Sequence, residues 1–227
     1  MVRVVCTWVP VAALCTVDLA GVRGVRHHDH VAEHVLVPGG DHDGETFEGD
    51  LSGQDAGAAR FLECRFEGCD LSEVRAPRAR FSETGLYAVH GAGLDLSGST
   101  WQDCVVQGGR LGAVALYDAD LSRVRFEGCK VDYLNLRGAR LRDVHFVDCQ
   151  LVEPDFAEAT LTGVDFSGSR VVAADFGRAT LSRVDLSEAL LTAPRGLAHL
   201  GGATISRLQL IELADAFADE LGITVRG

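Results

Sequence analysis

Large apolar residues recur at every fifth position from Leu51 to Leu191, without a change of phase. Of these 29 positions, here called centres, 26 hold a large apolar side chain, and the exceptions are Ala56, Ala76 and Gly91. A second row of mostly small residues stands two positions before the centres. A period of five fits neither an α-helix nor an ordinary strand, which repeat every 3.6 and about 2 residues. The chain must therefore turn a corner every five residues, which predicts a solenoid.

Residue types also repeat at a spacing of 20, as expected if four groups of five form one square coil. Phe61, Phe81 and Trp101 belong to one such series, and Phe126, Phe146 belong to another. Coils stacked as parallel strands would lie about 4.8 Å apart. A single coil cannot bury its core, so neighbouring coils supply the stability and the ends need caps. We expect about seven coils.

Several groups of five share one pattern, as in Cys69-Asp70-Leu71-Ser72-Glu73, Ala119-Asp120-Leu121-Ser122-Arg123 and Val184-Asp185-Leu186-Ser187-Glu188. They resemble the A(D/N)LXX signature of pentapeptide-repeat proteins, over about 145 of the 227 residues. The resemblance implies an all-β solenoid, a right-handed quadrilateral parallel β-helix with four groups of five per turn.

We expect three segments in the chain. Residues 1–45 are predicted to be irregular or loosely ordered, residues 46–191 to form the β-helix, and residues 192–227 to form a C-terminal α-helical cap. Phe47 resembles a centre that stands one position out of phase, so the first coil is expected to be irregular.

The N-terminal segment gives no sign of a transport signal or a metal site. Its apolar stretch, residues 2–17, lacks the basic start and the cleavage site of a signal peptide, so we expect a cytoplasmic protein. Histidines follow at His27, His28, His30 and His34. They lack a regular spacing, so a flexible solvated segment is the better interpretation.

The C-terminal segment predicts a helix. Ser206 and Gln209 match a capping box, and Gly222 is a helix stop, so the helix should end near Leu221. One face of this helix is apolar, and part of it must cover the last coil. We predict that the remainder forms a homodimer interface, with Leu210, Leu213, Phe217 and Leu221.

The sequence contains no recognisable catalytic motif. A P-loop, a dinucleotide-binding glycine motif, a zinc-protease HExxH and a nucleophile elbow are all missing. Five cysteines fall on the small inward row, where free cysteine behaves as a small apolar residue, and no CxxC spacing indicates zinc. We therefore expect no enzyme activity, no cofactor and no metal.

The charge points to protein partners. The net charge of −12, from 33 acidic and 21 basic residues, opposes binding to DNA or to an anionic membrane and favours a basic protein surface. Rows of anions on a rigid rod resemble duplex phosphates, which suggests DNA mimicry. The alternative is that these acids are solvated turn residues. The candidate partner-binding residues are Asp143, Asp148, Asp155, Glu158, Asp165, Asp175, Asp185 and Glu188.

The long unbroken repeat, the acidity and the C-terminal apolar helix resemble the Qnr/MfpA-type branch of pentapeptide-repeat proteins. That resemblance implies a homodimer that binds DNA gyrase or topoisomerase IV and lowers sensitivity to fluoroquinolones. The chain lacks the projecting loops of the Gram-negative Qnr members. Arg75, Arg78 and Arg80 also dilute the acidic character of the N-terminal half. The alternative function is a rigid scaffold that binds an unrelated partner.

Overall fold

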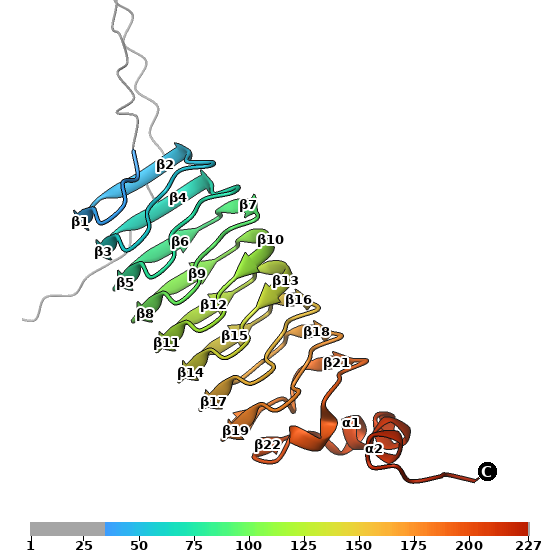
Figure 1. The fold of residues 1–227 in the computed structure, drawn as a ribbon. Coiled ribbons are helices and arrows are strands. Elements are labelled where there is room, and N and C mark those ends of the chain that lie inside the picture. The colour runs from blue at the N-terminus through green and yellow to red at the C-terminus, as the bar shows by residue number, and fades with distance from the viewer. Residues whose placement is uncertain (1–34, 227) are drawn as a thin grey trace, which may run out of the picture. The chain divides into compact units, whose positions relative to one another are not determined.

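The computed structural model describes residues 35–226. These residues form a β-solenoid whose strands stack in order from β1 and β2 to the C-terminal helices α1 and α2 (Figure 1). One sheet contains eight strands, one from each coil, and its neighbouring strands pair in parallel with residues mostly 20 apart. The predicted parallel solenoid is confirmed, with eight coils rather than about seven.

The eight-stranded sheet forms face 1 of the solenoid. From β3 to β19 the middle residue of each strand is a buried predicted centre, and in β1 this place is taken by His42, which stacks on Phe61. Its strands are β1 (Asp41–Asp43), β3 (Arg60–Leu62), β5 (Arg80–Ser82), β8 (Thr100–Gln102), β11 (Asp120–Ser122), β14 (Arg140–Arg142), β17 (Thr160–Thr162) and β19 (Thr180–Ser182).

Faces 2 and 3 share a twelve-stranded sheet, because β4 runs around the corner between them. Face 2 contains β2 (Thr46–Asp50), β4 (Arg65–Asp70), β6 (Gly85–Tyr87), β9 (Val105–Gln107), β12 (Arg125–Glu127) and β15 (His145–Val147), and β20 (Val184–Asp185) continues it and pairs with β22 (Ala203–Thr204). Face 3 contains β7 (His90–Ala92), β10 (Arg110–Ala115), β13 (Lys130–Asn135), β16 (Gln150–Val152), β18 (Arg170–Val172) and β21 (Leu190–Thr192). Face 4 contains every fourth centre from Ala56 to Phe176. Its consecutive coils pair mostly through single β-bridges, such as Asp155 with Asp175.

The first coil begins earlier than predicted. Strand β1 starts at Asp41 and pairs with β3, so residues 41–45 belong to the solenoid and not to an irregular N-terminal segment. Phe47 lies opposite Phe66, a spacing of 19, and the register shifts between Glu48 and Asp50. This shift confirms the predicted irregularity. The sequence period starts at Leu51 only because the coil before it has a different length.

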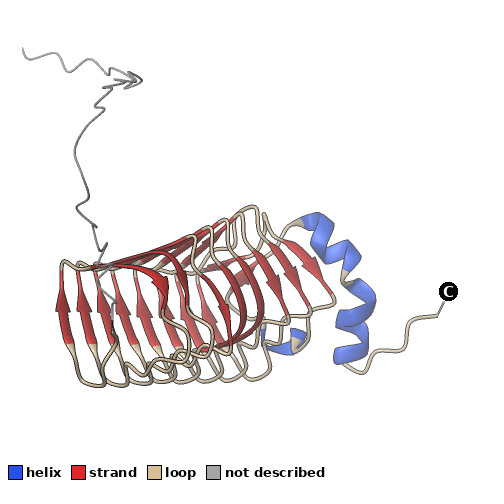
Figure 2. Cartoon of the chain, turned by 90° about the horizontal axis from the view of Figure 1, so that it is seen from above, coloured by secondary structure: helices blue, strands red, loops and turns tan. Residues whose placement is uncertain are grey.

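Aromatic ladders fill the core. Since residues 20 apart lie in register, rings in one series stack on each other, with centroids 4.9 Å apart for Phe61 and Phe81 and 4.1 Å for Phe81 and Trp101. Phe126, Phe146 and Phe166 continue this arrangement on face 2, at 4.9 and 5.0 Å. Figure 2 shows the strands in parallel rows with the helices at one end.

The C-terminal cap differs from the predicted single helix. A 3₁₀ turn η1 (Leu197–His199) precedes α1 (Arg207–Glu212) and α2 (Ala214–Glu220), which meet at Leu213. The capping box of Ser206 and Gln209 is present as predicted. Leu213 has φ −96° and ψ 2°, outside the helical region, and this turns the chain so that α2 packs against η1.

No helix in the described part of the chain has the length and apolar character that crossing a membrane requires.

Candidate functional site

The outward positions of the solenoid form columns, and these columns are the candidate interaction surfaces. Residues 20 apart pair directly, as Asp165 pairs with His145 on one side and with Asp185 on the other. Consecutive members of a column therefore lie about 4.8 Å apart. The eight predicted acids do not share one surface, because they are distributed over faces 2 and 4 and the corners of these two faces.

Half of these acids have a local structural role. An aspartate one position before a centre accepts, through Oδ1, the backbone N–H of the residue two positions on, which closes a small turn. This leaves Oδ2 as the outward oxygen. The turns are Asp155 with Ala157 (2.8 Å), Asp165 with Ser167 (3.2 Å), Asp175 with Gly177 (2.8 Å) and Asp185 with Ser187 (2.8 Å).

On face 4 the predicted acids are neutralised by arginines from other coils. Arg137 contacts Asp155 Oδ2 at 3.0 Å and Glu158 Oε1 at 3.3 Å, and Arg178 contacts the same Glu158 oxygen. Arg195 lies 3.7 Å from Asp175 Oδ2. Asp155 and Asp175 stack as neighbours, and the face is not purely acidic because Arg137 and Arg195 flank this pair. Arg137 and Arg195 fall outside the acidic stretch of sequence, and only the 20-residue register brings them to it.

Face 2 keeps more of its negative charge. Asp165 and Asp185 lie on this face, Asp148 and Glu188 lie at its corner with face 3, and the His145 ring contacts the Asp165 carboxylate. Asp148, Asp185 and Glu188 form no ion pair within the described part of the chain. The remaining predicted acid, Asp143, lies at the corner between faces 1 and 2.

Partial burial raises the pKa of Asp165, but the hydrogen bonds from His145 and Ser167 together outweigh it. The pKa of this carboxyl is therefore lower than usual, so it stays ionised at neutral pH. Asp148, Asp165, Asp185 and Glu188 are here called the face 2 acidic cluster.

The C-terminal residues predicted as a dimer interface do not share one environment. Leu213 is 7% exposed and packs on the last coil, and Phe217 is partly buried against the same core. Leu210 and Leu221 are 52% and 62% exposed. Four further apolar residues are exposed that the predicted interface did not include, namely Leu208, Ile211, Ile223 and Val225.

The buried Gln209 explains why the residues predicted for the interface do not all point away from the last coil. Its side chain is buried and donates 2.7 Å hydrogen bonds to the carbonyl oxygens of Leu186 and Ala189. The glutamine side chain thus points at the last coil and donates to its carbonyl oxygens, which have no following coil to pair with. Sequence reasoning assigned Gln209 to the capping box alone, and the box does not indicate this second role.

Among residues 35–226, no group of three or more His, Cys, Asp or Glu side chains is placed to hold a metal ion. The histidines His27, His28, His30 and His34, and the apolar stretch at residues 2–17, lie outside the described residues.

Models of the pentapeptide repeat region match residues 59–136 and 119–195, which together cover more than half of the chain. The chain belongs to the pentapeptide repeat family. No curated protein sequence gives a significant match.

Two solved structures illustrate the similarity. A trypsin-treated form of QnrB1, a plasmid-mediated fluoroquinolone resistance protein, is 20% identical with a TM-score of 0.40, covering 84% of this chain and 93% of its own. HetL is involved in heterocyst differentiation regulation in the cyanobacterium Nostoc sp. strain PCC 7120. It is 21% identical with a TM-score of 0.27, covering 76% of this chain and 90% of its own.

Proposed function

We propose that this pentapeptide-repeat protein binds a type II topoisomerase, DNA gyrase, by presenting the face 2 acidic cluster in place of DNA. Binding at the DNA-contacting surface would protect the enzyme from quinolone-like poisons or modulate its activity. The observation that carries this proposal is that Asp148, Asp185 and Glu188 lie on face 2 or at its corner with face 3, without a cationic partner in the described part of the chain.

The geometry of this face fits the chemistry of a DNA-binding surface. Asp165 and Asp185 are direct neighbours in one column, and Asp148 and Glu188 stand two coils apart in another, at about 10 Å. A rigid array of anions steers and orients a basic partner, because complementary charge increases the association rate and fixes the register. The turn bonds to Ser167 and Ser187 hold the two aspartates in place.

The test measures supercoiling and drug-stabilised cleavage by gyrase, with and without ciprofloxacin, while the protein is titrated. The test variant combines Asp148→Asn, Asp185→Asn and Glu188→Gln. The matched control combines Asp155→Asn, Glu158→Gln and Asp175→Asn, which removes the same charge from face 4. We expect the wild type to reduce drug-stabilised breaks. The face 2 variant should lose at least about tenfold in potency, while the face 4 control keeps it.

Each alternative result has a distinct meaning. Equal loss in both variants would show that net charge, rather than the face 2 acidic cluster, carries the effect. Inhibition of supercoiling without rescue from the drug would support mimicry and remove the protective role. No effect of the wild type would exclude gyrase as the partner.

The second candidate function is a rigid scaffold, and the ion pairs on face 4 favour it. Arg137, Arg178 and Arg195 convert an acidic surface into one of mixed charge. A surface of that kind fits a mixed-charge protein better than it imitates phosphates. An unaffected gyrase together with a specific pull-down that the face 4 control abolishes would support this function.

We also propose that the protein forms a homodimer through the exposed apolar residues of its C-terminal helices. Leu210 and Leu221 belong to the predicted interface, and Leu208 and Ile211 are further exposed apolar residues of the same segment. Exposed apolar side chains gathered on one short segment are typical of an interaction site.

Light scattering with size-exclusion chromatography tests the dimer. The double variant Leu210→Asp and Leu221→Asp should be monomeric with an unchanged circular dichroism spectrum. Leu190→Asp, a comparably exposed leucine on face 3, is the control and should remain dimeric. A wild-type monomer at high concentration would refute the proposal. Phe217→Asp is a poorer test, because Phe217 also packs on the core.

A further inference from the structure

Two buried cysteines lie next to each other on consecutive coils. The pairing of β13 with β16 places Lys130 opposite Gln150, so the residues before them, Cys129 and Cys149, are also in register. The Gln150 N–H donates to the Cys129 carbonyl oxygen at 2.8 Å, which confirms the contact between these two coils. In-register neighbours have Cα atoms about 4.8 Å apart, inside the range that a disulfide requires.

The other described cysteines have no such neighbour. Cys69 shares the column but is followed by Val89, and Cys64 is followed by Thr84 in its own column. Cys104 lies between Thr84 and Val124. Among residues 35–226, only Cys129 and Cys149 thus form a vertical pair. Both are free thiols in the structure.

The surroundings of the pair make one sulfur the nucleophile. Contact with the Cys149 thiol lowers the pKa of Cys129, while contact with Cys129 and burial raise the pKa of Cys149. Thiolates and not thiols attack oxidants, so Cys129 reacts first. Gly109 occupies the position above Cys129 in the column, and it has no side chain to cover the sulfur.

We propose that Cys129 and Cys149 are an oxidation site, at which a small hydroperoxide joins the two thiols in a disulfide between consecutive coils. This proposal is independent of the proposed function. With hydrogen peroxide, the Cys129 thiolate attacks one oxygen, the O–O bond breaks, and the departing hydroxide takes a proton to become water. Cys129 is then a sulfenic acid.

The second step closes the disulfide. The Cys149 sulfur attacks the Cys129 sulfur, the S–O bond breaks, and the hydroxyl group leaves with the Cys149 proton as a second water. Overall, two thiols and one hydrogen peroxide give one disulfide and two waters. Because both sulfurs are buried, peroxide reaches them only when the coils open locally, so the reaction is slow.

The test uses the full chain with Cys6→Ser and Cys15→Ser, which removes the two cysteines that lie outside the described residues. The protein is incubated with hydrogen peroxide between pH 6 and pH 9, free thiols are blocked, and the tryptic peptides are mapped without reduction. Trypsin separates all five remaining cysteines, and the pair falls in the peptides 126–130 and 143–170. We expect these two peptides to be cross-linked in a product two hydrogens lighter than the reduced protein.

Two variants and the pH profile make the result specific. Cys149→Ser should abolish the cross-link, and Cys104→Ser, a buried cysteine without a neighbour, should retain it. The rate should rise with pH across this range, because the attacking group is a thiolate. Free thiols on both peptides after prolonged exposure, sulfinic acid without a cross-link, or disulfides between other cysteines would overturn the proposal. The wild-type peptide map decides this even if a variant fails to fold.

Discussion

The two halves of the solenoid share one backbone register but fill their cores differently. In the N-terminal half the centres of face 4 include Ala56 and Ala76, on the side next to the ring stack of Phe61, Phe81 and Trp101 on face 1. In the C-terminal half face 4 carries Phe156 and Phe176, whose rings stack at 5.4 Å, and face 1 carries leucines instead.

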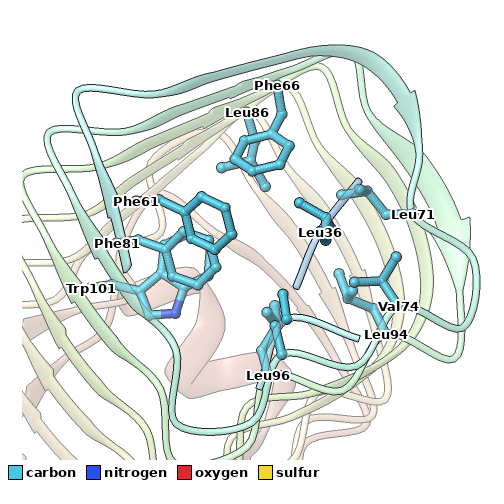
Figure 3. A pocket seen from close by; sticks show the side chains of 12 residues that line it. Leu36, Phe61, Phe66, Leu71, Val74, Phe81, Leu86, Leu94, Leu96 and Trp101 are labelled. Carbon is cyan, nitrogen blue, oxygen red and sulfur yellow. The ribbon is translucent and has the colours of Figure 1, made fainter. Parts of the chain in front are cut away.

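In the N-terminal half the large rings of face 1 do not completely fill the space left by the small centres of face 4. A cavity of about 20 Å³ remains there, lined by apolar side chains that include Phe81, Leu94 and Trp101 (Figure 3). In the C-terminal half Phe146, Phe156, Phe166 and Phe176 are all completely buried. The register of a solenoid is thus independent of how tightly each coil is filled, and local stability can differ along it.

The largest expected effect comes from removing an aromatic ring from the well-packed half. Phe156→Ala should lower the free energy of unfolding by about 4 kcal/mol, because Phe156 contacts three other rings and the site cannot collapse around the loss. Phe81→Ala should cost about 1 kcal/mol less, since this ring already lines a cavity and loses fewer contacts. Urea unfolding followed by circular dichroism measures both. Equal costs would contradict the difference between the halves.

The next effect concerns the C-terminal end. Gln209→Ala leaves the carbonyl oxygen of Ala189 without its donor and removes one of the two hydrogen bonds that the Leu186 carbonyl oxygen accepts, which should cost about 2 kcal/mol. Hydrogen exchange should accelerate in the last two coils and remain unchanged in the first two. Glu212→Ala, an exposed residue of the same helix, is the control and should leave the exchange unchanged. Protection that stays constant in Gln209→Ala would show that helix packing alone closes this end.

The sequence predicted the repeating part of the fold because register and period are the same property in a solenoid. Centres 20 apart must pair, so Phe61 faces Phe81 as soon as the period is recognised. The ends could not be predicted in this way. The first coil has a spacing of 19 between Phe47 and Phe66, and the last coil is closed by the buried Gln209, a residue that a hydrophobic pattern does not select.

A smaller effect of opposite sign is expected from filling the N-terminal cavity. Ala76→Val should stabilise the protein by about 1 kcal/mol, because added methyl groups enter apolar space that is already present. Ala159→Val, at a completely buried alanine in the C-terminal half, should instead destabilise by about 1 kcal/mol or more through overpacking. The same urea unfolding measures both variants. Destabilisation by Ala76→Val would show that the space is unavailable to a side chain.

The candidate surface was only partly predictable from the sequence. The sequence identifies the eight acids, and the 20-residue register predicts which of them share a column, as for Asp155 and Asp175. The neutralisation of the face 4 acids depends on side chains that reach across coils, such as Arg137 to Asp155, 18 residues apart. The local turn at Asp185 has a signal in the sequence, namely a serine two positions on, and it explains the aspartate without any partner.

The smallest expected effect distinguishes the face 2 acidic cluster from the neutralised face 4. The pKa of Asp165 is lowered in the folded protein, so the stability that its bonds to His145 and Ser167 contribute is present above the unfolded pKa of about 3.9. That stability is lost as the pH falls through the folded pKa. Asp165→Asn should therefore cost well under about 1 kcal/mol at neutral pH, and the cost should disappear at low pH.

Urea unfolding of the wild type and of Asp165→Asn between pH 2.5 and pH 7 measures this difference. Ser187→Ala is a suitable control, because it removes a hydrogen bond to Asp185 on the same face and leaves the contact of Asp165 with His145 intact. A stability difference that stays constant down to pH 2.5 would show that Asp165 acts through packing and not through its charge. The charge of Asp165 would then be available to a partner together with those of Asp148, Asp185 and Glu188.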